Sequence, residues 1–391
     1  MAQGRKALCR LLSREKVWPP VVVPFGLDPF GWHGSRPSYE ALCAYALDRC
    51  TLLPKVYPFA DPLCSGPGRA AVKTDEHVGG DGTRVRRHRL SGAARPLFME
   101  EVQRLGDSSW MLKKPWIGSD ADLEAFLELP SLSPAAPDLE SLREKERQVG
   151  RHGLPYAEVV DPFSLVASLF PTEDFYIRIL TDPATVERLI GLAQRRVLAS
   201  LEQLYRGAGC PFILRLIGAE AAAPPFLSRK DFLRLSAPFY REASRLAERY
   251  SVPRAVHCHG PVREIMGDVW EMGYDLLEPF EPAPRGNVSI AEALESAGGR
   301  GIVFGGVDDV LLQTGCAEDV RAAVTRCLDD ARRTGGPFIL SQSATPFTDP
   351  LGGRAEANLM LFLETGTAEE DGRPGSQLSG SQRPDSYHPA S

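Results

Sequence analysis

The chain has 391 residues with 45 lysines and arginines against 51 aspartates and glutamates, a formal net charge of −6, and 43% of its residues are hydrophobic. These values are ordinary for a globular protein with a large core. They exclude a small disulfide scaffold, a coiled coil, a collagen and a wholly disordered chain. The mildly negative balance also argues against a nucleic-acid-binding protein, which usually carries a clustered positive excess.

No apolar stretch approaches the roughly 20 residues that a membrane-spanning helix needs, and charges interrupt the first part of the chain, so we expect no membrane partner and no secretory signal. The eight cysteines form no Cys-x-x-Cys pair and no regular framework, which indicates free thiols and a cytoplasmic protein. Residues 365–391 are rich in Gly, Ser, Pro and Gln and are predicted to be a disordered tail.

Short apolar runs of β type recur along the chain before this tail. They are Val17–Phe25, Leu52–Phe59, Ala157–Val160, Pro211–Ile217, Arg254–His257, Asp275–Phe280, Gly301–Phe304 and Pro337–Leu340. Most lack polar alternation, which is typical of strands covered on both faces, as in a parallel sheet. Helical patterns lie between most of the runs. The sequence therefore predicts an α/β fold, a (β/α)8 TIM barrel, over residues 1–364.

Helix start and stop signals support this pattern. Asp182 before Pro183 predicts an N-cap followed by a first-turn proline. Ser289 with Glu292 predicts a capping box. Pro238 is expected to kink or break the helical segment in which it lies.

Residues 70–130 interrupt the rhythm of runs and helices. The turn at Gly79–Gly82 and the arginine-rich run Arg84–Arg89 indicate an antiparallel hairpin inserted into the barrel, followed by a short helix that opens at Ser119. We interpret the arginine run as a solvated strand face rather than a contact for nucleic acid.

The active site of such a barrel lies where the carboxyl ends of its strands meet, so the residues after each run are the candidates. Polar or ionisable residues follow almost every run: Asp28, Asp61, Asp161, Glu220, His257 with His259, Glu281, Asp308 with Asp309, and Ser341 with Ser343. Aspartate and serine also cap helices and turns. That structural role is favoured for Ser341 and for the aspartates after the first three runs.

His257 and His259 flank Cys258 at the end of one run. Side chains alternate along a strand, so both imidazoles point the same way and can hold one cation, with zinc or a similar divalent metal the natural partner. A pair of structural histidines is the alternative. The third ligand is expected from the end of the next run, with Glu281 as the first candidate and Glu278 as the second; each could instead form an ion pair or a cap.

Three further residues are candidates for catalysis. Glu220 could be a metal ligand or a general acid–base residue. Arg215 is a charge inside an apolar run, and it either pairs with one of these carboxylates or clamps an anionic substrate. Asp308 is a candidate for positioning the substrate. No phosphate-binding glycine loop, serine-nucleophile elbow or Walker lysine appears, so nucleotide hydrolysis and serine-triad chemistry are weakly supported.

The segment from about residue 150 to residue 363 resembles the uroporphyrinogen decarboxylase superfamily. The resemblance lies in the order of IGAE at 217–220, VHCHG at 256–260, MGYDLLEPFEPAPRGNVSIAEA at 272–293, GIVFGGVDDVLLQTGCAEDVRAAV at 301–324 and GGPFILSQSATPFTDP at 335–350. The stretch SSWMLKKPWIGSDADLEAFLEL at 108–129 is similar to the segment that precedes the barrel in that family.

This resemblance implies two activities. True decarboxylases act on a tetrapyrrole without a cofactor and grip it with an arginine-rich segment at the first strand, and this chain has no such segment there. Corrinoid-dependent methyltransferases bind zinc through His-x-Cys and a later Cys, and so activate a thiol that takes the methyl group of methylcobalamin. His257 matches the first ligand, His259 stands at the position of that cysteine, and the later cysteine is missing.

The leading prediction is a metal-dependent methyltransferase-like enzyme that moves a methyl group from a corrinoid to a thiol or similar small molecule. Its predicted metal ligands are His257, His259 and Glu281, and its predicted catalytic residues are Glu220, Arg215 and Asp308. The alternatives are a uroporphyrinogen decarboxylase or other tetrapyrrole-acting enzyme, and a non-catalytic corrinoid- or tetrapyrrole-binding barrel. A separate corrinoid carrier protein is an expected partner of the methyltransferase, and a homodimer is left open.

Overall fold

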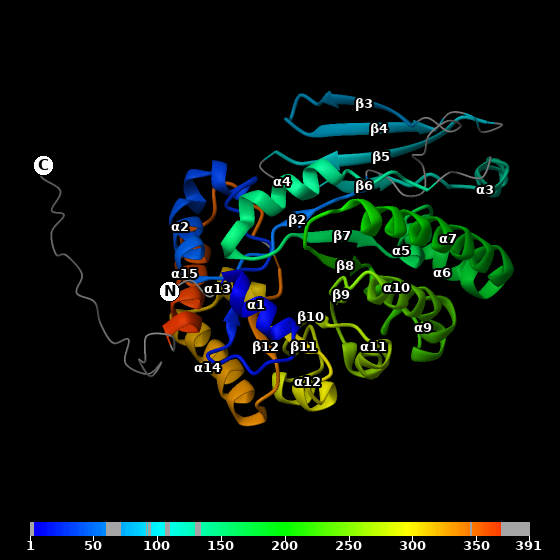
Figure 1. Cartoon of the computed structure of the whole chain (residues 1–391). Coiled ribbons are helices and arrows are strands. Elements are labelled where there is room, and N and C mark those ends of the chain that lie inside the picture. The colour runs from blue at the N-terminus through cyan, green and yellow to red at the C-terminus, as the bar shows by residue number, and fades with distance from the viewer. Residues whose placement is uncertain are drawn as a thin grey trace, which may run out of the picture.

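The structure, a computed structural model, describes residues 4–59, 72–90, 92, 95–105, 110–129, 134–344 and 346–368. Eight parallel strands form one curled sheet, consistent with a TIM-like barrel (Figure 1). In sheet order they are β1 (Val21–Val22), β12 (Phe338–Gln342), β11 (Ile302–Val307), β10 (Leu276–Phe280), β9 (Arg254–His257), β8 (Ile213–Ile217), β7 (Tyr156–Val160) and β2 (Lys55–Val56). Each strand overlaps one of the predicted runs, so the predicted parallel α/β architecture is confirmed.

The two ends of this sheet, β1 and β2, approach each other. The Thr51 N–H donates to the Val22 carbonyl at 2.9 Å, so the segment that leads into β2 lies against β1. On its other side Leu52 forms a parallel bridge with Gly153, just before β7. The sheet therefore curls back on itself around an interior.

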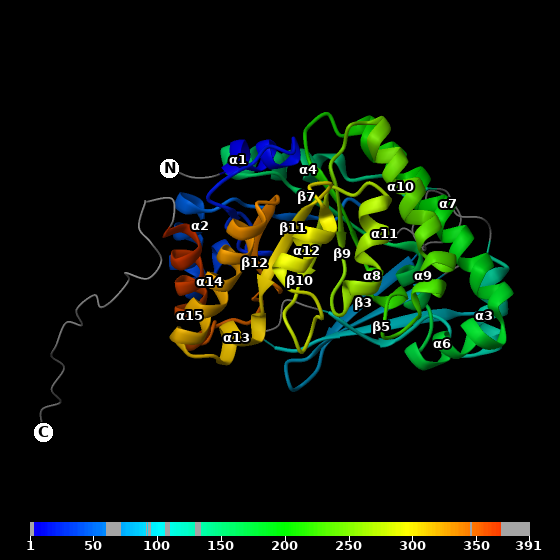
Figure 2. The same cartoon turned by 90° about the horizontal axis from the view of Figure 1, so that it is seen from below.

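Helices surround the curled sheet (Figures 1 and 2). In chain order they are α1 (Gly4–Leu12), α2 (Glu40–Arg49), α3 (Asp120–Leu127), α4 (Leu139–Val149), α5 (Pro162–Ala167), α6 (Thr172–Thr181), α7 (Pro183–Gly207), α8 (Ala219–Ala222), α9 (Arg229–Leu235), α10 (Ala237–Arg249), α11 (Met266–Glu271), α12 (Ile290–Ala297), α13 (Asp309–Thr314), α14 (Ala317–Thr334) and α15 (Gly353–Thr367). Among the described residues, none of these helices is long and apolar enough to span a bilayer.

Local signals in the sequence place several helix ends. The Asp182 side chain caps α7 by accepting from the Thr185 N–H, with Pro183 in the first turn. Ser289 and Glu292 form the predicted capping box at the start of α12. The predicted break at Pro238 is observed as the boundary between α9 and α10.

Two apolar cores lie on either side of the sheet. The inner core joins the strands to Leu8 and Leu11 of α1, and Arg14 just after α1 pairs with Asp275 at the amino end of β10. Since successive side chains of a strand face opposite ways, Ile213 of β8 enters the inner core while Leu214 packs outward. Arg215 lies two residues after Ile213 on the same face of β8, so its side chain also points to the interior.

The described part of residues 72–114 forms a separate antiparallel sheet. This sheet lies at the end of the barrel away from α1 (Figure 2). Its strands in order are β3 (Val72–Val78), β4 (Arg84–Leu90), β5 (Leu97–Gln103) and β6 (Met111–Lys114). This is two strands more than the hairpin that the sequence predicted. The arginines of β4 form cross-strand ion pairs, among them Arg84 with Glu76 and Arg87 with Glu100.

The helix α15 continues past residue 365, where the sequence predicted that the tail begins, and Thr365 and Thr367 are buried. The remainder of the predicted tail, residues 369–391, lies outside the described residues, as does Asp61.

Candidate active site

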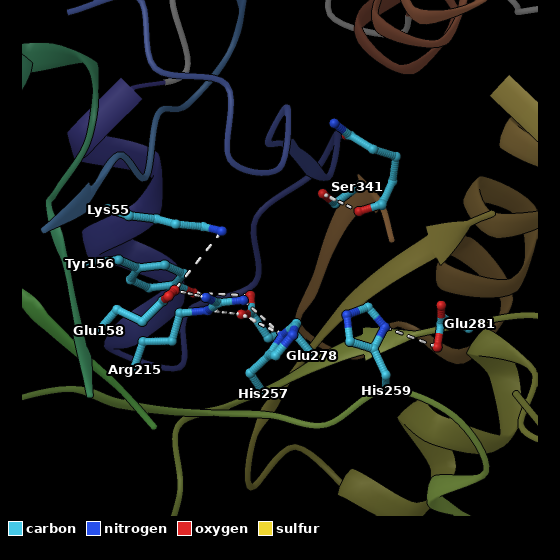
Figure 3. Close-up of polar contacts among 10 residues, drawn as sticks. Lys55, Tyr156, Glu158, Arg215, His257, His259, Glu278, Glu281 and Ser341 are labelled. Carbon is cyan, nitrogen blue, oxygen red and sulfur yellow. Dashed lines mark hydrogen bonds and ion pairs between the residues drawn. The ribbon is translucent and has the colours of Figure 1, made fainter. Parts of the chain in front are cut away.

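The barrel interior changes from apolar to polar along the strands. Lys55 of β2, Glu158 of β7, Arg215 of β8, His257 of β9 and Glu278 of β10 gather there (Figure 3). The strand register explains this gathering, because Glu158 lies opposite Arg215 in the β7–β8 pair and His257 lies opposite Glu278 in the β9–β10 pair. Five strands thus each contribute one ionisable side chain to a single network.

Arg215 is the centre of this network and is only 1% exposed. Its guanidinium donates to both Glu158 and Glu278, and Nη2 donates to Nδ1 of His257 at 2.7 Å. It also lies over the ring of Phe25, 4.9 Å from the centroid. Of the two roles that the sequence left open for Arg215, the structure shows the ion pair with carboxylates.

The charge of Arg215 controls the protonation of its neighbours. Burial by itself would raise the pKa of the Glu278 carboxyl, but the attraction of Arg215 and the neighbouring His257 ring together outweigh it, and the pKa falls to about 2. Burial and then repulsion by Arg215 lower the pKa of His257 to about 3. At neutral pH the network therefore holds an ionised Glu278 and an uncharged His257 ring.

The contact with Arg215 also assigns the proton on the His257 ring. A guanidinium has only donors, so the nitrogen that faces it, Nδ1, accepts, and the neutral ring carries its proton on Nε2. Nδ1 lies 3.4 Å from Glu278 as well, but it cannot donate there and accept from Arg215 at once, and the shorter contact is the one to Arg215. His257 therefore offers an Nε2–H donor.

His259 has the opposite arrangement. Its Nδ1 lies 3.2 Å from Oε2 of Glu281, which also accepts from the Gly260 N–H at 2.8 Å. Burial would raise the pKa of Glu281, but the hydrogen bonds from His259 and Gly260 lower it, so this carboxylate accepts. The neutral His259 ring consequently carries its proton on Nδ1 and keeps a lone pair on Nε2. Its side chain is 40% exposed and can meet a substrate.

The two imidazoles lie close together, as the sequence predicted, with ring centroids 4.5 Å apart and planes at 89°. Their free nitrogens are nevertheless unlike, because one presents a donor and the other an acceptor. The pair of rings is therefore an acid–base couple rather than two equivalent ligands.

The predicted zinc site can be tested against this geometry, since a metal ion binds lone pairs. His259 fits, with Glu281 in the supporting position that orients many metal-bound histidines. His257 does not fit, because Arg215 occupies Nδ1, leaves Nε2 protonated, and adds a positive charge. Within the described residues, no three His, Cys, Asp or Glu side chains form a group that could hold a metal ion. The zinc site with His257, His259 and Glu281 as ligands therefore stays a prediction.

Glu220, at the start of α8, belongs to the same region. Burial raises the pKa of its carboxyl, and the charges of His259 and Arg215 only partly offset that effect. Its Oε2 is buried, with no hydrogen-bond partner in the part of the chain that the structure describes. The acid–base role of Glu220 stays a prediction.

The other strand-end candidates have structural contacts. Asp308 caps α13 by accepting from the Val310 N–H and forms an ion pair with Arg285. Asp161 caps α5 and accepts a hydrogen bond from the Tyr240 hydroxyl at 2.7 Å. Ser341 donates to the Val23 carbonyl, and Asp28 accepts from Lys145 and from the Phe30 N–H. The predicted capping role is thus observed for Asp28 and Asp161, whereas Ser341 instead links β12 to the segment that follows β1.

Lys55 and Glu158 were not among the candidate site residues predicted from the sequence. Both are charged residues inside an apolar run, which is the signal that singled out Arg215. Applied to every run, that signal would have found both of them.

Comparisons with known proteins agree with the barrel. The profile of the uroporphyrinogen decarboxylase (URO-D) family matches residues 113–349, more than half of the chain. This chain belongs to the uroporphyrinogen decarboxylase family. No curated protein matches it significantly.

Among solved structures, this family member is similar to a methyltransferase from Methanosarcina mazei, with a TM-score of 0.58 and 14% identity over 94% of this chain and 98% of that one. At this identity the likeness shows the fold alone. A B12-independent methionine synthase from Shewanella sp. W3-18-1, in complex with selenomethionine, has a TM-score of 0.44 and 15% identity over 62% of this chain and 71% of that one.

Proposed function

We propose that this member of the uroporphyrinogen decarboxylase family is a methyltransferase-like enzyme that moves a methyl group from a corrinoid to a thiol or similar small acceptor. The observation that carries the proposal is the exposed His259 ring, whose Nε2 keeps a lone pair because Glu281 holds the proton on Nδ1. Such a nitrogen can take the proton of a bound thiol, and the thiolate is the nucleophile that methyl transfer needs.

The surroundings of His259 suit this role. When Nε2 takes the proton, the ring becomes an imidazolium cation next to the Glu281 carboxylate, 3.2 Å from Nδ1. Glu220 is close enough to add to this attraction, since its own carboxyl feels the charge of His259. The thiolate sulfur then bonds to the methyl carbon, while the carbon–cobalt bond breaks and its electron pair stays with the donor.

The test is an assay with methylcobalamin as donor and 2-mercaptoethanol or homocysteine as acceptor, with the methylated thiol measured by mass spectrometry. We expect His259→Asn to lower the rate by about 10²-fold or more, the usual size of a general-base contribution. The control is His77→Asn, because His77 is an exposed histidine of β3, remote in sequence from the site. Equal rates for the wild type and His259→Asn would contradict the proposal.

Metal analysis of the purified protein tests the assignment of protons on the two rings. About one zinc per chain, lost in His257→Ala and in His259→Ala, would support the zinc site that the sequence predicted and contradict our assignment for His257.

Decarboxylation of a tetrapyrrole is the second candidate. It is favoured by the Nε2–H donor of His257 and the cation of Lys55 inside the barrel, because a cofactor-free decarboxylase needs a proton donor and a partner for carboxylates. Formation of coproporphyrinogen from uroporphyrinogen would select this activity. Tight cobalamin binding without turnover of any acceptor would instead indicate a non-catalytic binding barrel.

A further inference from the structure

Lys55 is a second reactive group in the barrel, and the proposed methyl transfer does not use it. It extends from β2 toward the Glu158–Arg215 network, and its side chain is 25% exposed (Figure 3). Its Nζ lies 4.0 Å from Oε2 of Glu158 and 5.1 Å from the ring centroid of Phe25. Within the described part of the chain, no hydrogen bond to this Nζ is observed.

The charged and titratable groups that face Lys55 come from four elements. They are Glu158 of β7, Arg215 of β8, Glu278 of β10 and His33 of the short 3-10 helix His33–Ser35. Both glutamates already accept from Arg215, so Lys55 shares its nearest carboxylate, Glu158, with that cation. Burial and the charge of Arg215 lower the pKa of the Lys55 amine to about 8, and Glu278 offsets this only in part.

We propose that Lys55 is an amine nucleophile that forms an imine with a carbonyl-bearing small molecule in the barrel. A partly buried amine beside a fixed cation is the arrangement that prepares a lysine for this chemistry. The Phe25 ring covers one side of the amine, and a quarter of the Lys55 side chain is exposed.

The reaction balances without an oxidant, a reductant or a cofactor. The lone pair of the neutral amine forms a bond to the carbonyl carbon, and the carbonyl oxygen takes a proton. The carbon–oxygen bond then breaks and water leaves, so that amine, carbonyl compound and one proton give a protonated imine and water. The protonated imine carries the same charge as the lysine ammonium, so Glu158 and Glu278 keep the electrostatic environment that they have in the free protein.

Reductive alkylation of the wild-type protein tests this proposal directly. Acetaldehyde with cyanoborohydride converts each imine into a stable ethylamine, and peptide mass spectrometry then gives the rate at each lysine. Lys73, an exposed lysine of β3, is the internal reference. At pH 7 about a tenth of an amine of pKa 8 is neutral and nucleophilic. We therefore expect Lys55 to react at least about 10 times faster than Lys73.

Two further measurements complete the test. The labelling rate at Lys55 should reach half of its maximum near pH 8. Lys55→Arg should abolish this fast labelling and leave the rate at Lys73 unchanged. Labelling of Lys55 no faster than that of Lys73 in the wild type would overturn the proposal, whatever the outcome of the methyl-transfer assay.

Discussion

Replacing Arg215 with methionine is the sharpest test of the buried network. The variant keeps the length and much of the volume of the side chain but removes the cation from which Glu158, Glu278 and His257 all accept. Two buried carboxylates would then lose their closest counter-charge, and among the described residues only Lys55, 4.0 Å from Glu158, would remain nearby. Because a buried ion left unpaired costs far more than an exposed one, we expect the free energy of unfolding at pH 7 to fall by about 3–5 kcal/mol.

The pKa of Glu278 supports this magnitude independently. It falls from 4.5 to about 2 in the folded protein, and 2.5 units correspond to about 3 kcal/mol. Because the folded pKa is depressed, this contribution is fully present above pH 4.5 and is lost as the pH falls through 2. Without Arg215, burial instead raises the pKa of the same carboxyl, so protonation stabilises the variant. The difference between variant and wild type should therefore shrink as the pH falls from 7 to 4.

Urea denaturation followed by circular dichroism at both pH values measures this difference. Arg234→Met is the matched control, since Arg234 also pairs with two carboxylates, Glu187 and Asp231, but is 39% exposed. Its loss should cost less than about 1 kcal/mol. In the double variant Arg215→Met/Glu278→Gln, part of the lost stability should return, because one buried charge is gone. An Arg215→Met protein as stable as Arg234→Met at pH 7, or a difference that grows toward pH 4, would refute the reasoning.

Three further substitutions test other parts of the structure. Burial raises the pKa of Asp161 from 3.8 to about 6, so the wild type loses stability as the pH rises through this range. Asp161→Asn does not titrate, so its free energy of unfolding relative to the wild type should rise by up to about 3 kcal/mol between pH 4 and pH 7. Urea titrations at both pH values measure this change, and a constant difference would contradict it. Gly305→Ala places a Cβ 2.6 Å from the Phe280 nitrogen at a φ of +142° and should lower the unfolding free energy by about 2 kcal/mol or more, whereas Gly80→Ala, with nothing within 4 Å, should not. Ser289→Ala removes the cap of α12 and should cost about 1 kcal/mol in thermal denaturation; no shift in midpoint would show that the capping box contributes nothing.

The strands and helix ends could be predicted because their causes are local. A strand covered on both faces is mostly apolar, and that property is visible in five or six consecutive residues, as in β11. The caps at Asp182 and Ser289 depend on a side chain and an N–H three residues away. The four strands of residues 72–114 were predicted only as a hairpin, because their pairing joins polar segments whose pattern is weak.

The candidate site could be predicted only in part. The alternation of a strand brought His257 and His259 to one face, and their proximity is confirmed. The protonation of the two rings could not be predicted, because it depends on Arg215, 42 residues before His257, and on Glu281 of the following strand end. Lys55 and Glu158 were missed, since their neighbours in space come from other strands.

The amino-acid sequence by itself determined the eight-stranded parallel architecture, the caps of its helices and the positions of the ionisable residues, because each of these follows from the chemistry of a few neighbouring residues. Only the tertiary structure decided what those residues do. Strand register brings Arg215 between two glutamates and an imidazole, and that one cation makes His257 a proton donor while His259 remains an acceptor. The charge state of a buried group depends on its neighbours in space, and a linear pattern does not contain them.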